Sequence, residues 1–477
     1  MAACVVAVLA SLRARCSALL CVGDGNCPAV VVDSVFFENV GTQASGLLVY
    51  DTRAALVDST YFVGNENTDL EHGGGGLLIT ATNGFGALWT VSRSSFQHNT
   101  PQGGVVSTVT AGSVSNSVVI DQCSFTAAHG SCGFQFSGGV DVLVRNSSLR
   151  DCMAPEAPWA GFYVKDSDST VLVEDTTFKD IFARASSALL VGGAAQLGVV
   201  RCHFERCRSN GEDKFSVTPY MPGAVDVFAV TNVRFTNVSF VQCTTLGHGG
   251  ALRLARVAAA NVEQALFFQC SAQIAGGAVY GINVTRLTVR DTVFEACSVA
   301  GGLHSGGGAI SAYLCSVDMA RSRFHQNEAY SGGGFTTSSY DPVSDGIVVS
   351  IRETIFTENR GLAESGALEL WRGLQGYVSG CLFHQNSAAN YAGSFFALGV
   401  SPHKVYWCCQ DGYTLCAIVC DCAQLHLSPF HSWQWRCCYG LLVEARHLLP
   451  CPQYCFYQQH CLDSWYEAHV GCAIACT

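Results

Sequence analysis

A phrase of fixed form recurs thirteen times along this chain of 477 residues. It places two apolar residues one position apart and a Phe five positions after the second, as in Val349-x-Ile351-x4-Phe356. The Phe position is occupied by Phe36, Phe62, Phe96, Phe125, Leu149, Phe178, Phe204, Phe240, Phe267, Phe294, Phe324, Phe356 and Phe383. Neighbouring copies are 24 to 36 residues apart. A mean spacing of about 29 residues is typical of a repeat architecture.

The position five residues before each aromatic residue is apolar in every copy. It holds Val31, Val57, Val91, Ile120, Val144, Val173, Val199, Phe235, Val262, Val289, Met319, Ile351 and Val378. The position two residues earlier is apolar in most copies. Because alternate side chains of a strand share a face, this spacing predicts a strand with one buried face.

Pairs of glycines fall between the phrases and are followed by a small residue. Examples are Gly192-Gly193-Ala194, Gly249-Gly250-Ala251, Gly276-Gly277-Ala278 and Gly307-Gly308-Ala309. Glycine adopts positive φ without a steric penalty, so each pair predicts a tight corner. No stretch of helical period separates the corners from the strands.

One such unit cannot bury its own apolar face, whereas stacked units bury a continuous core. We therefore expect an all-β fold, a right-handed parallel β-helix solenoid of about 13 coils over residues 25–402 with almost no helix. The Phe column becomes an internal stack, and the column three residues later becomes a ladder of amides. That ladder column holds Asn39, Asn65, Asn99, Asn327, Asn359 and Asn386, with Cys152, Cys207, Cys243, Cys270 and Cys297 in the middle copies.

The alternation of Phe-x-x-Asn with Gly-Gly-Ala resembles the repeats of chlamydial polymorphic outer-membrane proteins. More broadly it is similar to right-handed parallel β-helix proteins of the pectate-lyase-like (pectin lyase-like) superfold. The resemblance covers roughly residues 25–400. It implies an adhesin-like protein that is secreted or held at the cell surface, in the outer membrane or the cell wall.

Charge and hydropathy narrow the set of partners. Charged residues are 13% of the chain, the net charge is −11, and no basic run is present, so nucleic acid is not an expected partner. No apolar run reaches the roughly 18 residues of a membrane-spanning helix.

Residues 1–24 contain a short apolar run followed by Arg13 and Arg15, which fits a degenerate signal or a truncated N-terminal segment.

Cysteine is abundant and unevenly placed: 14 residues lie before position 403 and 12 after it. In the ladder column a cysteine is either a small buried hydrophobe in place of Asn or half of a disulfide between coils, and we favour the first reading. Sequons at Asn146, Asn237 and Asn283 are candidate glycosylation sites if a eukaryotic cell secretes the chain.

The repeat pattern ends at His403. Residues 403–477 contain no Asn, but four of the seven Trp. This Cys-rich tail could be a disulfide-stapled cap for the solenoid or a segment that is not a folded module. The least favoured reading is a zinc site built on Cys416, Cys420 and Cys422 with His426 and His431. We expect the tail to add no coils.

No linear motif identifies an active site. Gly247-His248-Gly249 resembles a motif of polygalacturonases, but the Asp-Asp pair and other motifs of that family are absent. The sequence therefore predicts no catalytic, cofactor or metal residues, and Ca²⁺ only if the alternative of a polysaccharide lyase or glycoside hydrolase holds. The expected function is that of a non-catalytic surface or secreted β-helix rod, adhesin-like or structural, whose loops on one edge are candidate contacts for a polysaccharide or another cell-surface molecule. Candidate contacts are Trp159, Tyr220 in the longest variable segment (211–223), and His248.

Overall fold

The computed structural model falls into two compact units, Met1–Asn261 and Val262–Thr477, and each is described by itself. The described residues are 11–12, 19–22, 28–41, 45–68, 75–81, 86–100, 104–108, 116–127, 130–157, 159–165, 169–210, 222–302, 305–338, 346–371, 374–390, 392–398 and short strands between 417 and 458. These residues form strands and turns, and none of them belongs to a helix that could cross a membrane.

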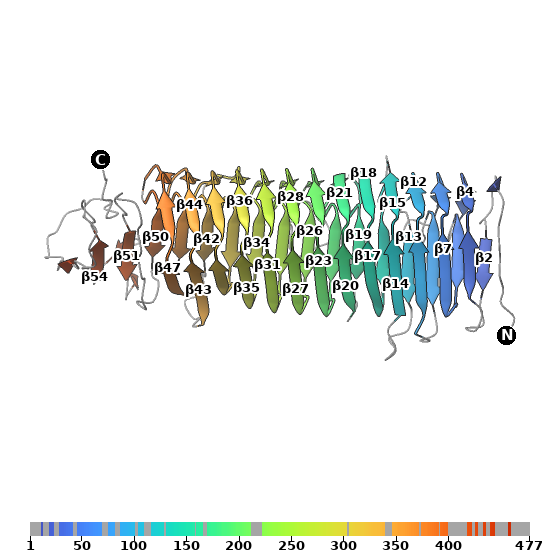
Figure 1. Ribbon diagram of the computed structural model, residues 1–477. Helices are drawn as coiled ribbons and strands as arrows, with labels where there is room; N and C mark the ends of the chain where they lie inside the picture. Colours follow the sequence, from blue (N-terminus) through green and yellow to red (C-terminus); the bar gives the residue numbers. More distant parts are fainter. Residues whose placement is uncertain are drawn as a thin grey trace. The chain divides into compact units, whose positions relative to one another are not determined.

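Each turn of a unit contributes strands to three parallel sheets, which we call sheets C, A and B in the order the chain visits them. One turn of the first unit runs through β27 (Asn232–Thr236) in sheet C, β28 (Ser239–Val241) in sheet A and β30 (Leu252–Ala255) in sheet B. Each strand pairs in parallel with its counterpart in the neighbouring turn, as Figure 1 shows.

In the first unit, the other strands of sheet C are β3 (Ala29–Val32), β7 (Ala54–Asp58), β11 (Leu88–Ser92), β14 (Asn116–Asp121), β17 (Val140–Arg145), β20 (Thr170–Glu174) and β23 (Gln196–Val200). Those of sheet A are β1 (Ser11–Leu12), β4 (Val35–Phe37), β8 (Tyr61–Val63), β12 (Ser95–Gln97), β15 (Ser124–Ala127), β18 (Ser148–Ala154), β21 (Thr177–Ala183), β24 (His203–Glu205), β25 (Arg208–Ser209) and β29 (Thr244–Thr245). Those of sheet B are β2 (Leu19–Val22), β6 (Leu47–Tyr50), β10 (Leu77–Ala81), β13 (Gly104–Thr108), β16 (Phe134–Ser137), β19 (Phe162–Lys165), β22 (Leu189–Gly192) and β26 (Val225–Phe228).

In the second unit, sheet C contains β35 (Arg286–Arg290), β39 (Val317–Ala320), β43 (Ile347–Arg352) and β47 (Leu374–Ser379). Sheet A contains β32 (Leu266–Phe268), β33 (Ser271–Ala272), β36 (Val293–Glu295), β37 (Ser298–Val299), β40 (Arg323–His325), β41 (Glu328–Ala329), β44 (Ile355–Thr357), β45 (Arg360–Gly361), β48 (Leu382–His384) and β49 (Ser387–Ala388). Sheet B contains β34 (Val279–Ile282), β38 (Ile310–Tyr313), β42 (Phe335–Ser338), β46 (Leu368–Trp371) and β50 (Phe395–Leu398).

The remaining strands are β5 (Val40–Gly41), β9 (Glu66–Asn67), β31 (Ala259–Glu263), which contains the boundary residues, and in the tail β51 (Ala417–Asp421), β52 (Leu425–Leu427), β53 (Trp433–Trp435), β54 (Tyr439–Val443) and β55 (Tyr457–Gln458). Most of the tail lies outside the described residues. The same holds for the three interpretations of it, as a cap, as a zinc site and as a segment that is not a folded module.

The fold class expected from the sequence is confirmed. The solenoid has about 11 turns, slightly fewer than the 13 coils expected. Parts of several corners lie outside the described residues.

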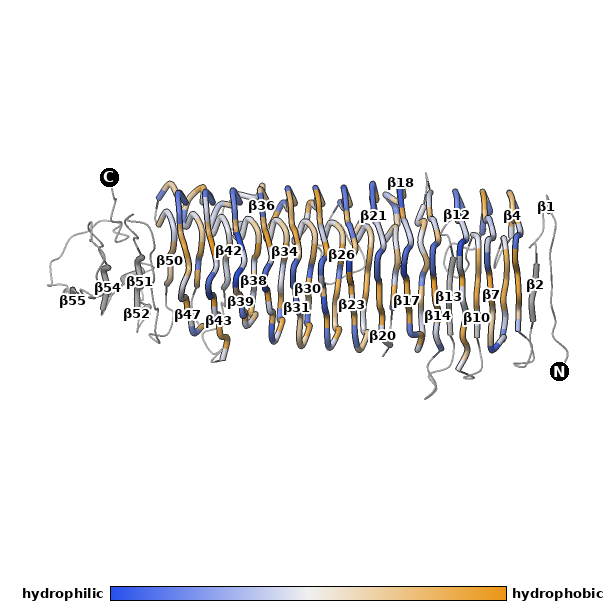
Figure 2. The backbone as a smooth tube through the Cα atoms, in the orientation of Figure 1, coloured by the Kyte–Doolittle hydropathy of each residue, from blue (hydrophilic) through white to orange (hydrophobic). Residues whose placement is uncertain are grey.

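Both columns of the phrase point into the core. Every residue of the column five before Phe is at most 2% exposed. The Phe column is buried as well, except for half-buried Phe383 at its end. Figure 2 shows apolar positions recurring on successive turns.

The Phe rings stack face to face along each unit. Ring centroids are 4.6 Å apart for Phe178 and Phe204 in the first unit, and 4.7 Å for Phe294 and Phe324 in the second. These distances match the spacing of about 4.8 Å between paired strands. Leu149 interrupts the stack, and Phe162 from sheet B packs edge-on against Phe125 and Phe178 there.

The asparagine column forms the ladder that the sequence predicts. Asn65 Nδ2 donates to the carbonyl of Phe36 at 3.0 Å and to Asn99 Oδ1 at 2.9 Å. Asn65 Oδ1 in turn accepts from the backbone and side-chain nitrogens of Asn39. In the second unit, Asn327, Asn359 and Asn386 repeat the pattern.

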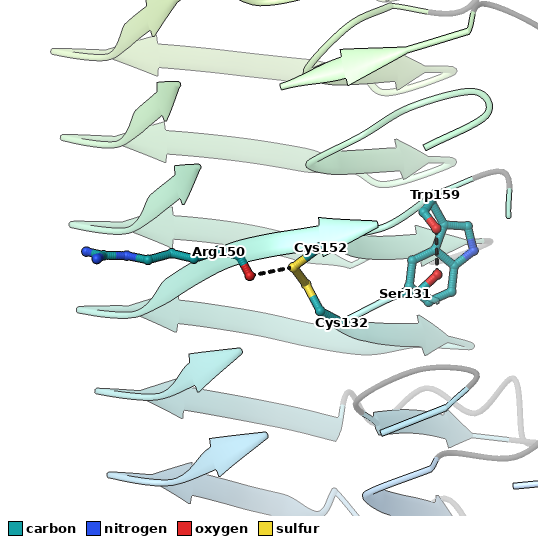
Figure 3. The surroundings of a disulfide bond; sticks show 5 residues. All are labelled: Ser131, Cys132, Arg150, Cys152 and Trp159. Atoms are coloured by element: carbon teal, nitrogen blue, oxygen red, sulfur yellow. Dashed lines mark hydrogen bonds between the residues drawn. A yellow bond between two sulfur atoms is a disulfide. The ribbon is translucent and has the colours of Figure 1, made fainter. Parts of the chain in front are cut away.

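Cysteine replaces asparagine in this column without losing the corner bond. The Cys207 thiol donates to the Phe178 carbonyl at 3.7 Å, the bond that asparagine makes in other turns. The column cysteines at 207, 243, 270 and 297 are buried thiols, which supports the small-hydrophobe reading for them. Cys152 differs, because it forms a disulfide with Cys132 of the preceding corner (Figure 3).

The glycine corners are confirmed in part. Gly249, Gly276 and Gly307 have φ of 70°, 63° and 71° at the corner that leads into sheet B. Gly192-Gly193 was wrongly grouped with them, because it ends β22 and lies at the following corner.

The sequence pattern also missed two further corners of each turn, where residues other than glycine adopt the left-handed conformation. One lies three residues before Phe, with φ from 46° to 54° in every turn but the one where Gly380 takes this position with φ 62°. The other lies two residues after Phe in most turns, as at Asp180 (φ 55°) and Gln269 (φ 52°).

Candidate functional site

The aromatic side chain expected to contact a ligand is not available for one. Trp159 is 6% exposed, and its ring lies 5.6 Å from that of Tyr163. Its carbonyl oxygen accepts a hydrogen bond from Ser131 Oγ at 2.6 Å (Figure 3). Trp159 therefore holds its loop in place.

His248 lies half-buried at the corner that enters β30. Burial, together with nearby Arg253, lowers the pKa of His248 to about 4, so the ring is neutral at physiological pH. Arg253 itself pairs with buried Asp226 at 3.5 Å. Trp159 and His248 lie at the entries to strands of different turns, β19 and β30, and Tyr220 lies outside the described residues.

The three sequon asparagines are exposed at corners. Asn146, Asn237 and Asn283 have φ of 50°, 53° and 53°. Asn146 Nδ2 also donates to Asp121 Oδ1 at 3.0 Å. These positions meet the requirement for accessibility, and glycosylation itself stays a prediction.

Several acidic side chains on the outer faces are paired with arginines of the neighbouring turn. Arg201 donates to both carboxylate oxygens of Asp175 at 2.7 and 2.8 Å, and Arg321 does the same to Asp291 at 2.8 and 2.9 Å. These arginines hold the pKa of both carboxyls below their usual range. Such carboxylates stay ionised and are poor general acids.

The pairing is not one-to-one everywhere: in the first unit, Arg206 contacts both Asp180 and Glu205. In sheet C of the second unit, three arginines surround the single carboxylate of Asp318. Arg352 Nη2 lies 2.8 Å from Asp318 Oδ1, while Arg290 and Arg286 lie 3.1 and 4.0 Å from Oδ2. We call these four residues the arginine cluster.

The strand register explains how the cluster forms. Arg290 on β35 and Arg352 on β43 flank Ala320 of β39 in one cross-strand row. Asp318 lies in the adjacent row, between Thr288 and Ser350. Because Ala320 is small, both flanking guanidinium groups can lean across β39 towards Asp318.

Burial would raise the pKa of the Asp318 carboxyl, but bonds from Arg352 and Arg290 outweigh it and hold that pKa below its usual value. Asp318 is therefore ionised at neutral pH. The cluster then carries three positive charges and one negative charge, a net of about +2 on a chain whose net charge is −11.

The arginines retain the capacity to bind another anion. Their side chains are 66% (Arg286), 37% (Arg290) and 50% (Arg352) exposed, and each guanidinium has five N–H donors. A single carboxylate cannot satisfy all of these donors. Tyr377 of β47, opposite Ser350 in the register, adds a half-buried ring to the same face.

The alternation of inward and outward residues along each strand is the sequence signal that points to this cluster. Arg286, Thr288 and Arg290 alternate with inward Leu287 and Val289, which places them outside. The missing information was the register between copies of the phrase, which brings Asp318 between arginines 28 residues before it and 34 residues after it. Among the described residues, no group of three or more His, Cys, Asp or Glu could hold a metal ion.

Comparison with known proteins supports the fold alone. The family model described as "Right handed beta helix region" matches residues 17–204 and 75–251. No curated protein and no solved structure gives a significant match. The match does not confirm the narrower resemblance to chlamydial polymorphic outer-membrane proteins. With the parallel turns described above, it identifies the described solenoid as a right-handed parallel β-helix.

Proposed function

We propose that this protein is a non-catalytic β-helix of the cell surface or extracellular space that binds acidic carbohydrate through the arginine cluster. The observation that carries the proposal is the convergence of three arginines on one exposed sheet face around a single aspartate. Planar guanidinium groups bind carboxylates in a bidentate manner, so uronate and other acidic sugars are the class of ligand that fits best.

The flat face suits a repeating ligand. Paired strands follow one another at about 4.8 Å, so Arg290 on β35 and Arg352 on β43 lie two strand spacings apart, on either side of β39. A polysaccharide lying across these strands would present its carboxylates in a periodic row. Each exposed pair contributes little alone, but several charges that act together bind a polyanion with measurable affinity.

Two further features favour an extracellular location. The disulfide between Cys132 and Cys152 is of a kind that persists in oxidising compartments. The exposed sequon asparagines are consistent with passage through a secretory pathway. Neither feature bears on which carbohydrate is bound.

The test is calorimetric binding of polygalacturonate, alginate and neutral dextran to the full chain at low and moderate salt. We expect the two acidic polymers to bind, dextran not to bind, and affinity to fall as salt screens the cluster. Absorbance of unsaturated sugars and reducing-end assays should stay at background. Binding of dextran as tight as that of the acids would contradict the proposal, and product release would favour the lyase or hydrolase alternative.

A further inference from the structure

A pair of carboxyl groups in the second unit has a different character from the paired acids on the surface. Glu369 of β46 is fully buried, with 0% of its surface exposed. Glu364, from the corner that leads into β46, is half-buried next to it. Neither group takes part in the arginine cluster.

One hydroxyl group bridges the two carboxyls. Ser331 Oγ lies within hydrogen-bond reach of Glu369 Oε2 and at 3.1 Å from Glu364 Oε2. Thr336 Oγ1 donates to Glu369 Oε2 at 3.2 Å. Since a serine hydroxyl has a single hydrogen, it can donate to only one of the two carboxyls. The other carboxyl has to donate to Ser331, and only a protonated carboxyl can do so.

Burial decides which carboxyl carries the proton. The ionised form of a fully buried carboxyl is strongly disfavoured, and the half-buried Glu364 is the better site for the charge. Burial raises the pKa of Glu369 well above its usual value, and Glu364 adds to this through a hydrogen bond and through like-charge repulsion. The hydrogen bonds then all point in one direction. Thr336 donates to Glu369, Glu369 donates to Ser331, and Ser331 donates to the Glu364 carboxylate.

Among the described residues, the groups that interact with Glu369 include no cation that offsets its charge. Its register partners are Thr336 on β42 and Phe396 on β50, both uncharged. The indole of Trp371, on β46 itself, also faces the carboxyl, and Glu364 is the titratable group that interacts with it.

We propose that Glu369 is a neutral carboxylic acid in the folded protein, and that the chain Thr336–Glu369–Ser331–Glu364 is a pH-sensitive lock. It ties the corner at residues 361–366 to the preceding turn. The backbone ties this corner too, because Ala363 N donates to the Tyr330 carbonyl at 2.9 Å. When Glu369 loses its proton to solvent base, two carboxylates face one serine hydroxyl and the lock opens.

The direction of the pH effect follows from linkage. The pKa of Glu369 in the folded state lies above the pKa in the unfolded chain, so folding stability from this group is complete below about pH 4.3. It is lost as pH rises from there towards the folded pKa. The lock is therefore strongest in acid surroundings.

Infrared spectroscopy of the full chain at neutral pH tests the protonation directly. We expect the carbonyl stretch of a buried protonated carboxyl in the wild type, its loss in E369Q, and its retention in E358Q, which changes an exposed glutamate bonded to Gln326. Absence of the band in the wild type, or its persistence in E369Q, would overturn the proposal.

Thermal unfolding between about pH 5 and pH 8 tests the lock. The amide of E369Q can donate to Ser331 as the acid does, so this variant should fold and should lose less stability than the wild type as pH rises. E364Q should move ionisation of Glu369 to lower pH, because the like charge is gone. Equal pH dependence in the wild type and E369Q would contradict the lock.

Discussion

Each asparagine in the ladder column uses its whole amide, so its contribution exceeds that of a single surface hydrogen bond. Asn65 is 0% exposed and bonds to groups in both neighbouring turns. A thiol can supply the donor to the Phe carbonyl, as Cys207 does, but it lacks the amide oxygen. Turns with cysteine therefore keep one bond of the ladder and give up the other.

Asn65→Ala should destabilise the protein by about 2–4 kcal/mol. The substitution leaves the Phe36 carbonyl and the amide groups of Asn39 buried without their partner. Urea unfolding measures this loss. The matched control Asn232→Ala, at an exposed position of β27, should change stability by less than about 0.5 kcal/mol. Equal effects at the two positions would show that the ladder contributes nothing.

Corner residues with positive φ offer a second test at this scale. Ala229 has φ 53° and no functional group that could favour this conformation. Ala229→Gly should raise stability by roughly 0.5–1 kcal/mol, because the left-handed strain of about 1–2 kcal/mol exceeds the entropic cost of glycine. Ala259→Gly, in strand β31, should lower it by about 0.5–1 kcal/mol. Thermal melts of both variants test whether the change in stability is positive for Ala229→Gly and negative for Ala259→Gly.

The elements of each turn were predictable to different degrees from the sequence. The inward strand columns were found because burial forces an apolar residue at the same place in every copy, as from Val31 to Val378. The left-handed corners were missed because Asp, Arg, Gln and Asn all occupy them, as at Asp175 and Arg201. Backbone geometry sets those corners, and it leaves little trace in residue type.

The second glycine of each corner pair is fixed by the approach of the next turn. A Cβ on Gly277 would lie 2.0 Å from the carbonyl oxygen of Gly308 and 2.6 Å from that of Ser298. Gly277→Ala should therefore cost about 3 kcal/mol or more, since backbone atoms on two sides have to move.

Gly302→Ala is the matched control for this substitution. A Cβ there would meet no atom within 4 Å, so stability should be unchanged or rise by about 0.4–1 kcal/mol. Differential scanning calorimetry of both variants distinguishes a packing constraint from a general intolerance of alanine. Similar losses in the two variants would remove the packing explanation.

At the scale of the whole molecule, periodicity was enough to predict the fold but not the candidate site. The repeat identifies strands and their buried faces, while the arginine cluster depends on register between turns whose lengths differ. Arg290, Asp318 and Arg352 are far apart in the chain and become neighbours only once Thr288, Asp318 and Ser350 are aligned. The loops singled out from the sequence, by contrast, hold a buried Trp159 and a neutral, half-buried His248.

Acidic carbohydrate is expected to bind across β35, β39 and β43. Calorimetry with oligogalacturonides of increasing length tests this expectation on the wild type, the double variant R290A/R352A and the control R145A. Arg145 is 46% exposed and pairs with Asp121 at 3.0 Å, so it matches Arg352 in exposure and pairing but lies outside the cluster.

We expect the affinity of the wild type to rise with oligomer length until the ligand spans the cluster, and R145A to match it. R290A/R352A should bind roughly tenfold more weakly, because losing two exposed ion pairs worth up to about 1 kcal/mol each amounts to about 1.4 kcal/mol, a factor of ten. Affinity that does not depend on length, or equal binding by the wild type and R290A/R352A, would contradict the assignment of this face as the binding site.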